Sequence, residues 1–175
     1  MRVEPHEAKL APSYKLGLHH LLSALYQEKG DKKRILMIEQ DNITDGVVKE
    51  WLTLQGKDPN DIIQVVKGDY TPLSANHLVE LIHKSKDTVC TVIGTQLGKI
   101  YGNNMQTERI QEACTDNSMV FILDASSAIG PVPVQLVNWR VEAAVLNTDK
   151  FVVGGPSVTY INESLLSTLK AQDAQ

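Results

Sequence analysis

The chain has 175 residues, 42% of them hydrophobic and 22% charged, which is an ordinary composition for one globular domain with a sizeable core. Its net charge of −4 gives no electrostatic basis for binding nucleic acid or an anionic membrane surface. No apolar run approaches the roughly 20 residues of a membrane span. The two cysteines and the absence of a signal-peptide pattern predict an intracellular protein with free thiols, cytoplasmic in the first instance and mitochondrial as the alternative.

Helix-type and strand-type segments alternate along the chain. Residues 1–12 read as a polar arm, and Ser13 then caps a helix that Gly30 ends. Strands are predicted at residues 34–39, 62–66, 88–93, 119–124 and 143–147, with a sixth candidate at 158–161. Helices are predicted from Thr44 to Gly56, from Ser74 to Ile82, at residues 105–114, and in a short segment that Asn162 caps. We therefore expect one α/β domain over residues 13–170, a mostly parallel sheet with helices on both faces, and a polar tail at 171–175.

Two polar residues follow predicted strands near the end of this pattern. Asp124 closes the apolar run that begins at Met119, and Lys150 lies beyond the strand at 143–147, shortly before two glycines. Functional groups in parallel sheets gather at the carboxyl ends of the strands. A lysine can form a Schiff base with an aldehyde cofactor, and a carboxylate can keep a pyridine nitrogen protonated. The pair indicates a site for an aldehyde cofactor that acts as an electron sink, although alone Asp124 could be a turn cap and Lys150 a surface charge.

Other candidates have simpler alternatives. Ser13 could bind a phosphate through its hydroxyl and the free amides of the first helical turn, or it could only cap the helix. Thr95 could be a second phosphate or substrate contact, or a turn hydroxyl. The histidines have no zinc-binding spacing, and no nucleotide-binding glycine loop is present.

In order and spacing, these segments resemble the large domain of kynureninases, in the fold-type I, class V branch of pyridoxal-phosphate enzymes. Upstream, SYKLGLHHLLSALY is similar to the family's Thr-initiated helix, and RILMIEQDNITDGVVKEWLTLQGKD is similar to its strand, turn and following helix. The resemblance extends from about Ser13 to Glu163. Its ungapped part runs through Asp124, Ala128, Gly130, Val132, Trp139 and Lys150.

The resemblance implies a role for each candidate residue. Lys150 would be the Schiff-base lysine, Asp124 the partner of the pyridine nitrogen, and Ser13 a phosphate-binding hydroxyl. Thr44 and Asp45 would close the turn that contacts the cofactor. The implied reaction is hydrolysis of kynurenine to anthranilate and alanine, with the cofactor as electron sink. Family active sites lie between two subunits, which implies a protein partner.

The chain departs from the family at several cofactor-contacting positions. Asn42 replaces a stacking aromatic, Ile43 a proline, and Ser127 a histidine, so that Ser127 and Thr95 are the remaining polar candidates there. Asp149 replaces a phosphate-binding tyrosine, and its carboxylate would repel a phosphate or pair with Lys150. Each lost contact would weaken cofactor binding by about 1–3 kcal/mol. The sequence also stops before the family's small domain, which supplies an arginine for the substrate carboxylate.

Two functions remain open. The first is a degenerate kynureninase-like domain without full turnover, acting as a scaffold or protein-interaction subunit in a homodimer or a larger complex. The second is an active pyridoxal-phosphate-dependent kynureninase, or a fragment of one, with a small-molecule substrate. The departures concentrate at the cofactor contacts while the core pattern is intact, which favours the first hypothesis narrowly. A third hypothesis, a nucleotide-binding domain, is supported by the α/β pattern alone.

Overall fold

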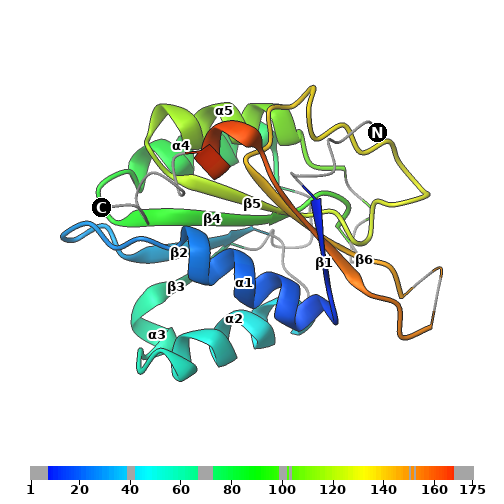
Figure 1. Ribbon diagram of the computed structural model, residues 1–175. Helices are drawn as coiled ribbons and strands as arrows, with labels where there is room; N and C mark the ends of the chain where they lie inside the picture. Colours follow the sequence, from blue (N-terminus) through cyan, green and yellow to red (C-terminus); the bar gives the residue numbers. More distant parts are fainter. Residues whose placement is uncertain are drawn as a thin grey trace.

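The computed structural model describes residues 8–38, 42–66, 73–98, 102, 104–149, 151 and 153–167. Figure 1 shows the described part as one sheet with helices on both faces. The helices are α1 (Tyr14–Leu25), α2 (Asn42–Leu54), α3 (Pro59–Ile62), α4 (Ala75–Lys84) and α5 (Thr107–Asp116), with further helical residues at 163–167. The strands are β1 (Ala8–Ala11), β2 (Arg34–Ile38), β3 (Ile63–Val66), β4 (Val89–Thr95), β5 (Val120–Asp124), β6 (Ala143–Asn147) and β7 (Ser157–Ile161).

The sheet is mostly parallel, as the sequence predicts. Its strand order is β1-β7-β6-β5-β4-β2-β3, and every pair from β6 to β3 is parallel. The antiparallel strands β7 and β1 complete the other edge. The carboxyl ends of β2, β4, β5 and β6 therefore meet at one edge of the sheet, which is where the candidate residues were expected.

One prediction about the N-terminus is wrong. Residues 8–11 were expected to belong to a polar arm, but they form β1 and pair with β7, Ala8 opposite Tyr160 and Ala11 opposite Ser157. The pairing satisfies backbone groups that β7 would otherwise leave open. The segment AKLA shows no strand alternation because an edge strand keeps side chains such as Leu10, 74% exposed, in solvent.

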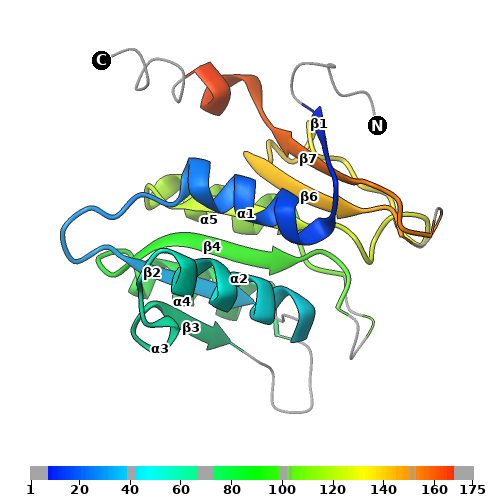
Figure 2. The ribbon, with the colours of Figure 1, turned by 60° about the horizontal axis from the view of Figure 1, so that its bottom comes forward.

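Both faces of the sheet are apolar and both are covered. Figure 2 shows α1 and α2 over one face, and α4 and α5 lie against the other. Alternate residues of β2 point to opposite sides: Ile35 and Met37 pack with α1 and α2, whereas Leu36 and Ile38 pack with α4 and α5. This arrangement explains the continuous apolar runs in the sequence. None of the helices in the described ranges is long and apolar enough to cross a bilayer.

Helix boundaries differ from the predictions where local backbone geometry intervenes. Ser13 caps α1 as predicted, but the helix ends at Leu25 because Tyr26 is already extended. Gly30 instead has a φ of 61°, inside the tight turn that leads to β2. Thr44 was expected to cap the second helix, but α2 begins at Asn42 and Thr44 lies inside its first turn.

The remaining boundaries follow the predictions closely. Ser74 caps α4, and Asn162 caps the helical residues 163–167 through a 2.8 Å bond from the Leu165 amide to its Oδ1. The short helix α3, capped by Asp58, was not predicted. A single turn of four residues carries no helical periodicity that a sequence pattern could reveal.

Two helical glycines are expected to respond oppositely to alanine. A Cβ on Gly17 in α1 would lie 2.8 Å from Ser157 Oγ and 3.1 Å from Thr159 Cγ2, whereas one on Gly46 in α2 would meet nothing within 4 Å. We expect Gly17→Ala to lower the free energy of unfolding by about 1–3 kcal/mol through overpacking. Gly46→Ala should raise it by about 0.5–1 kcal/mol through helix propensity. Urea unfolding measures both, and a stabilised Gly17→Ala variant would show that α1 does not pack this closely on β7.

The partly buried carboxyl of Glu142, just before β6, predicts a pH-dependent contribution to stability. Burial raises the pKa of Glu142, so its ionised form is disfavoured in the folded state. Its contribution to stability is therefore greatest below its unfolded-state pKa and is lost as pH rises through the raised folded-state pKa. We expect Glu142→Gln to raise the melting temperature at about pH 8 but not at about pH 4. The matched variant Glu112→Gln removes an exposed carboxyl, and an equal gain there would show that net charge is the cause.

Candidate cofactor site

Asp124 is the best-defined polar group at the carboxyl edge. It is the last residue of β5 and is 4% exposed. Its Oδ2 accepts hydrogen bonds from Tyr14 Oη at 2.9 Å and Thr44 Oγ1 at 3.2 Å. Its Oδ1 accepts one from the Ser126 amide at 2.9 Å. We refer to Tyr14, Thr44 and Asp124 as the Asp124 cluster.

The cluster joins residues that are far apart in the sequence. Tyr14 is the first residue of α1 and Thr44 lies in the first turn of α2, so both helices begin beside the end of β5. The Tyr14 and Thr44 hydroxyl oxygens are also 2.8 Å apart. Each hydroxyl has one proton to donate, and a bond to a carboxylate is the stronger choice. Both hydroxyls therefore favour Asp124 over each other.

The other predicted residues lie around this cluster. Ser13 precedes Tyr14 and its Oγ accepts the Leu16 amide at 3.3 Å, which is the expected helix cap. Thr95 is buried at the end of β4, directly opposite Asp124 in the sheet register. Ser127 is buried in the turn after β5. The structure thus brings these side chains to one region, while their roles toward a phosphate stay predictions.

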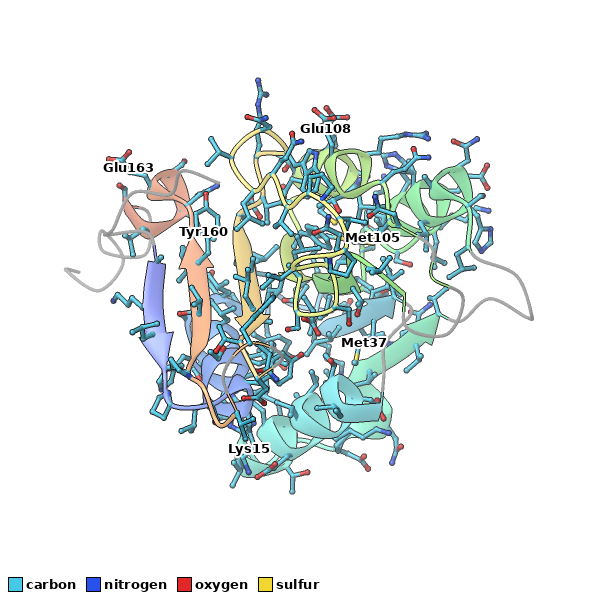
Figure 3. All side chains as sticks on the ribbon, turned by 90° about the vertical axis from the view of Figure 1, so that its right-hand side faces the viewer. Lys15, Met37, Met105, Glu108, Tyr160 and Glu163 are labelled. Atoms are coloured by element: carbon cyan, nitrogen blue, oxygen red, sulfur yellow. The ribbon has the colours of Figure 1, made fainter. Side chains whose placement is uncertain are left out.

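Figure 3 shows how the two sides of the sheet approach this region. Lys15, next to Tyr14 in α1, lies on one side, and Met105, ahead of α5, lies on the other. Met105 also closes the loop after β4, because its amide donates to the Gln96 carbonyl at 2.7 Å. The two labelled residues therefore mark the two helical layers on opposite sides of the sheet.

Sequence reasoning missed two residues of this region. One is Tyr14, which donates to Asp124, and the other is Gln96, which is fully buried just after β4. The side-chain Nε2 of Gln96 donates to the Pro133 carbonyl at 3.0 Å, and the backbone N–H of Gln96 donates to the Asp124 carbonyl. A tyrosine immediately after a helix cap was the available signal for Tyr14. The neighbourhood of Gln96 depends on loop packing, which the sequence does not reveal.

Asp45 and Asp149 add two further carboxylates at this edge. Asp45 Oδ2 accepts from Lys49 at 2.6 Å in the next helical turn. Asp149 Oδ2 accepts from Asn147 Nδ2 at 3.1 Å. The predicted pairing of Asp149 with Lys150 cannot be placed, because Lys150 lies outside the described residues. The side chain of Asn42 lies outside them as well.

The described groups do not fit pyridoxal phosphate as they stand. Both lone pairs of Asp124 Oδ2 already face hydroxyls of the chain, and the carboxylate is nearly inaccessible. Two other buried oxygens at this edge, Asp45 Oδ1 and Gln96 Oε1, have no hydrogen-bond partner. Both are acceptors, whereas a phosphate needs donors or cations. Asp149 adds negative charge close to the end of β6.

Comparison with solved structures identifies the class of fold. Ureidoglycine–glyoxylate aminotransferase from Bacillus subtilis superposes with a TM-score of 0.74 at 19% identity, covering 95% of this chain and 41% of that one. Alanine–glyoxylate aminotransferase from Nostoc sp. gives a TM-score of 0.70 at 15% identity, covering 93% of this chain and 42% of that one. The fold is that of the large domain of fold-type I pyridoxal-phosphate enzymes, which confirms the prediction.

Comparison with curated sequences finds kynureninases that are similar to this chain. The kynureninase of Shouchella clausii (strain KSM-K16) is 29% identical over 151 residues, covering 84% of this chain and 35% of that protein. The kynureninase of Monosiga brevicollis is 24% identical over 165 residues, covering 87% of this chain and 36% of that protein. No family model matches the chain. The chain is thus a divergent kynureninase-like domain that spans about a third of the length of these relatives.

Proposed function

We propose that this chain is a kynureninase-like domain without catalytic turnover, and that it works by associating with other polypeptide chains. The observation that carries the first part is the internal hydrogen bonding of Asp124. Its carboxylate already accepts three bonds from the chain and is 4% exposed. At most one of its roughly four acceptor sites, on Oδ1, remains for an external ring nitrogen.

Two further features support the loss of turnover. Ser127 and Asp149 occupy positions at which kynureninases, by the resemblance, have a histidine and a phosphate-binding tyrosine. The unpartnered acceptors Asp45 Oδ1 and Gln96 Oε1 give the site the polarity that a phosphate avoids. The proposal also includes an intracellular compartment, cytoplasmic or mitochondrial, which the buried free thiols of Cys90 and Cys114 support.

Exposed apolar side chains support association. Phe151 is 60% exposed and Val153 is 99% exposed in the loop between β6 and β7. Apolar side chains that lie together on a surface commonly mark a protein–protein contact, and these two would belong to such a patch. The partner would be a second copy in a homodimer or another subunit of a larger complex. Light scattering of the purified chain distinguishes a dimer from a monomer, and Phe151→Ser should weaken a dimer that uses this loop.

A kynureninase activity, or that of a kynureninase fragment, is the second candidate. It is favoured by the similarity to kynureninases over more than four fifths of this chain and by the position of Asp124 at the end of β5. In this case the chain would be a pyridoxal-phosphate-dependent hydrolase with kynurenine as its small-molecule substrate.

One experiment separates the two candidates. Purified protein is mixed with pyridoxal phosphate, and the absorbance band of a lysine–cofactor Schiff base is followed beside the variant Lys150→Ala. We expect no saturable band that depends on Lys150, and no fluorescent anthranilate after kynurenine is added. A band that Lys150→Ala abolishes, together with anthranilate formation, would overturn the proposed loss of turnover.

A further inference from the structure

We infer that Tyr14 is an internal competitor for Asp124, and that its phenol excludes a pyridine-ring ligand from the site. The inference rests on the proposed function, because it names the residue responsible for the loss of cofactor binding. Tyr14 would then be a specificity-determining residue, and removing its side chain would open Asp124 to an external nitrogen donor.

The geometry places the phenol on the carboxylate itself. Tyr14 Oη lies 2.9 Å from Asp124 Oδ2 and 2.8 Å from Thr44 Oγ1. Tyr14 is 9% exposed and packs in the cluster of apolar residues beneath α1 and α2. Because Thr44 takes the other lone pair of Oδ2, an incoming donor can reach that oxygen only after a neighbouring group moves.

The chemistry of the phenol matches that of the ligand it would exclude. A protonated pyridine nitrogen offers one N–H donor carried on a six-membered aromatic ring. The Tyr14 side chain offers one O–H donor on a ring of the same size, held next to Asp124 by the start of α1. A donor attached to the same chain competes at an effective concentration on the order of millimolar or more. A free ligand is therefore at a disadvantage at Asp124.

Tyr14 rather than Thr44 is the residue that excludes the ring. Thr44 is 1% exposed and has a small side chain within the first turn of α2. Removing its hydroxyl would leave the phenol in place. Tyr14 follows the helix cap directly, and truncating it to alanine removes the whole ring from beside Asp124. The space released would be about the size of one aromatic ring.

The test measures ligand binding to the full chain, not activity. The variants are Tyr14→Ala, Tyr14→Leu and the double variant Tyr14→Ala/Asp124→Asn. The probes are pyridoxal phosphate and pyridoxal, which lacks the phosphate that Asp149 would repel. Calorimetric titration gives the dissociation constants. Tyr26→Phe is the matched control, because the Tyr26 hydroxyl lies 2.7 Å from both Glu28 Oε1 and the Lys33 carbonyl oxygen, beyond the far end of α1.

We expect Tyr14→Ala to bind both probes at least about ten-fold more tightly than the unmodified chain does, the equivalent of one hydrogen bond. The gain should disappear in the double variant, which separates binding at Asp124 from reaction with surface lysines. Tyr26→Phe should bind as the unmodified chain does. Circular dichroism confirms that each variant folds. If Tyr14→Ala does not fold, Tyr14→Leu, which also removes the aromatic ring but keeps an apolar side chain, must itself bind pyridoxal more tightly than the unmodified chain does.

Equal affinity in Tyr14→Ala and the unmodified chain would overturn the inference, as would a gain that survives Asp124→Asn or weaker binding in Tyr14→Ala. These outcomes leave the proposed function intact if the unmodified chain neither binds pyridoxal phosphate nor forms anthranilate. Conversely, tight binding with turnover by the unmodified chain would overturn the proposed function. The two failures are therefore distinguishable.

Discussion

Phe121→Ala is expected to lower the free energy of unfolding by about 3–5 kcal/mol. Phe121 is fully buried in β5, opposite Val92 of β4 in the centre of the sheet. Its ring packs against Gly94, where an added Cβ would lie 3.2 Å from Phe121 Cε2. Truncation would remove the apolar contact and leave a cavity that neighbouring strands cannot close without breaking their hydrogen bonds.

The chain provides a matched control for this prediction. Its second phenylalanine, Phe151, is 60% exposed, so Phe151→Ala should change the unfolding free energy of the monomer by less than about 0.5 kcal/mol. Urea unfolding followed by circular dichroism measures both variants under the same conditions. Comparable losses in the two variants would show that β5 is not the centre of the core.

The second large effect is an energetic coupling between Tyr14 and Asp124. Tyr14→Phe and Asp124→Asn are each expected to destabilise the fold, and the double variant should lose less than the sum of the two. We expect an interaction energy of about 1–3 kcal/mol, because the bond joins a neutral donor to a buried carboxylate. The four unfolding free energies of the double-mutant cycle give this value without any ligand.

The control is a second double-mutant cycle that pairs Asp124→Asn with Tyr26→Phe. Tyr26 lies 12 residues further along the chain, about 18 Å along a helix axis at 1.5 Å per residue. Distant sites are additive within about 0.5 kcal/mol, so Tyr26→Phe and Asp124→Asn should not couple. An interaction energy near zero for Tyr14 and Asp124 would mean that their contact adds no stability, and Tyr14 would then be a weak competitor for a ligand.

The two predictions concern different parts of the same strand. Phe121 anchors the middle of β5 in the core, and Asp124 at its end holds the first turns of α1 and α2 through hydroxyl groups. The fold of a cofactor enzyme can therefore persist by core packing while the polar end of the strand is satisfied internally. This separation of fold from site is the physical basis of the proposal that the domain has lost turnover.

Much of the fold was predictable because it depends on local patterns. The apolar runs at β2, β4, β5 and β6 are buried on both faces, so their composition alone indicated a parallel sheet. The caps at Ser13, Ser74 and Asn162 follow from hydroxyl and amide side chains that accept first-turn amides. β1 was missed because a four-residue edge strand gains its stability from pairing with β7, which is 146 residues away along the chain.

Some features of the site also follow from local sequence patterns, whereas others depend on tertiary contacts. The sequence by itself determined that Asp124 ends a buried strand, that Ser13 starts a helix, and that several family contacts are replaced. Only the tertiary structure decided that Tyr14 and Thr44, 30 residues apart, meet on one oxygen of Asp124. The physical reason is that a side-chain hydrogen bond depends on how the ends of α1 and α2 pack against β5, and no spacing within the chain encodes that arrangement.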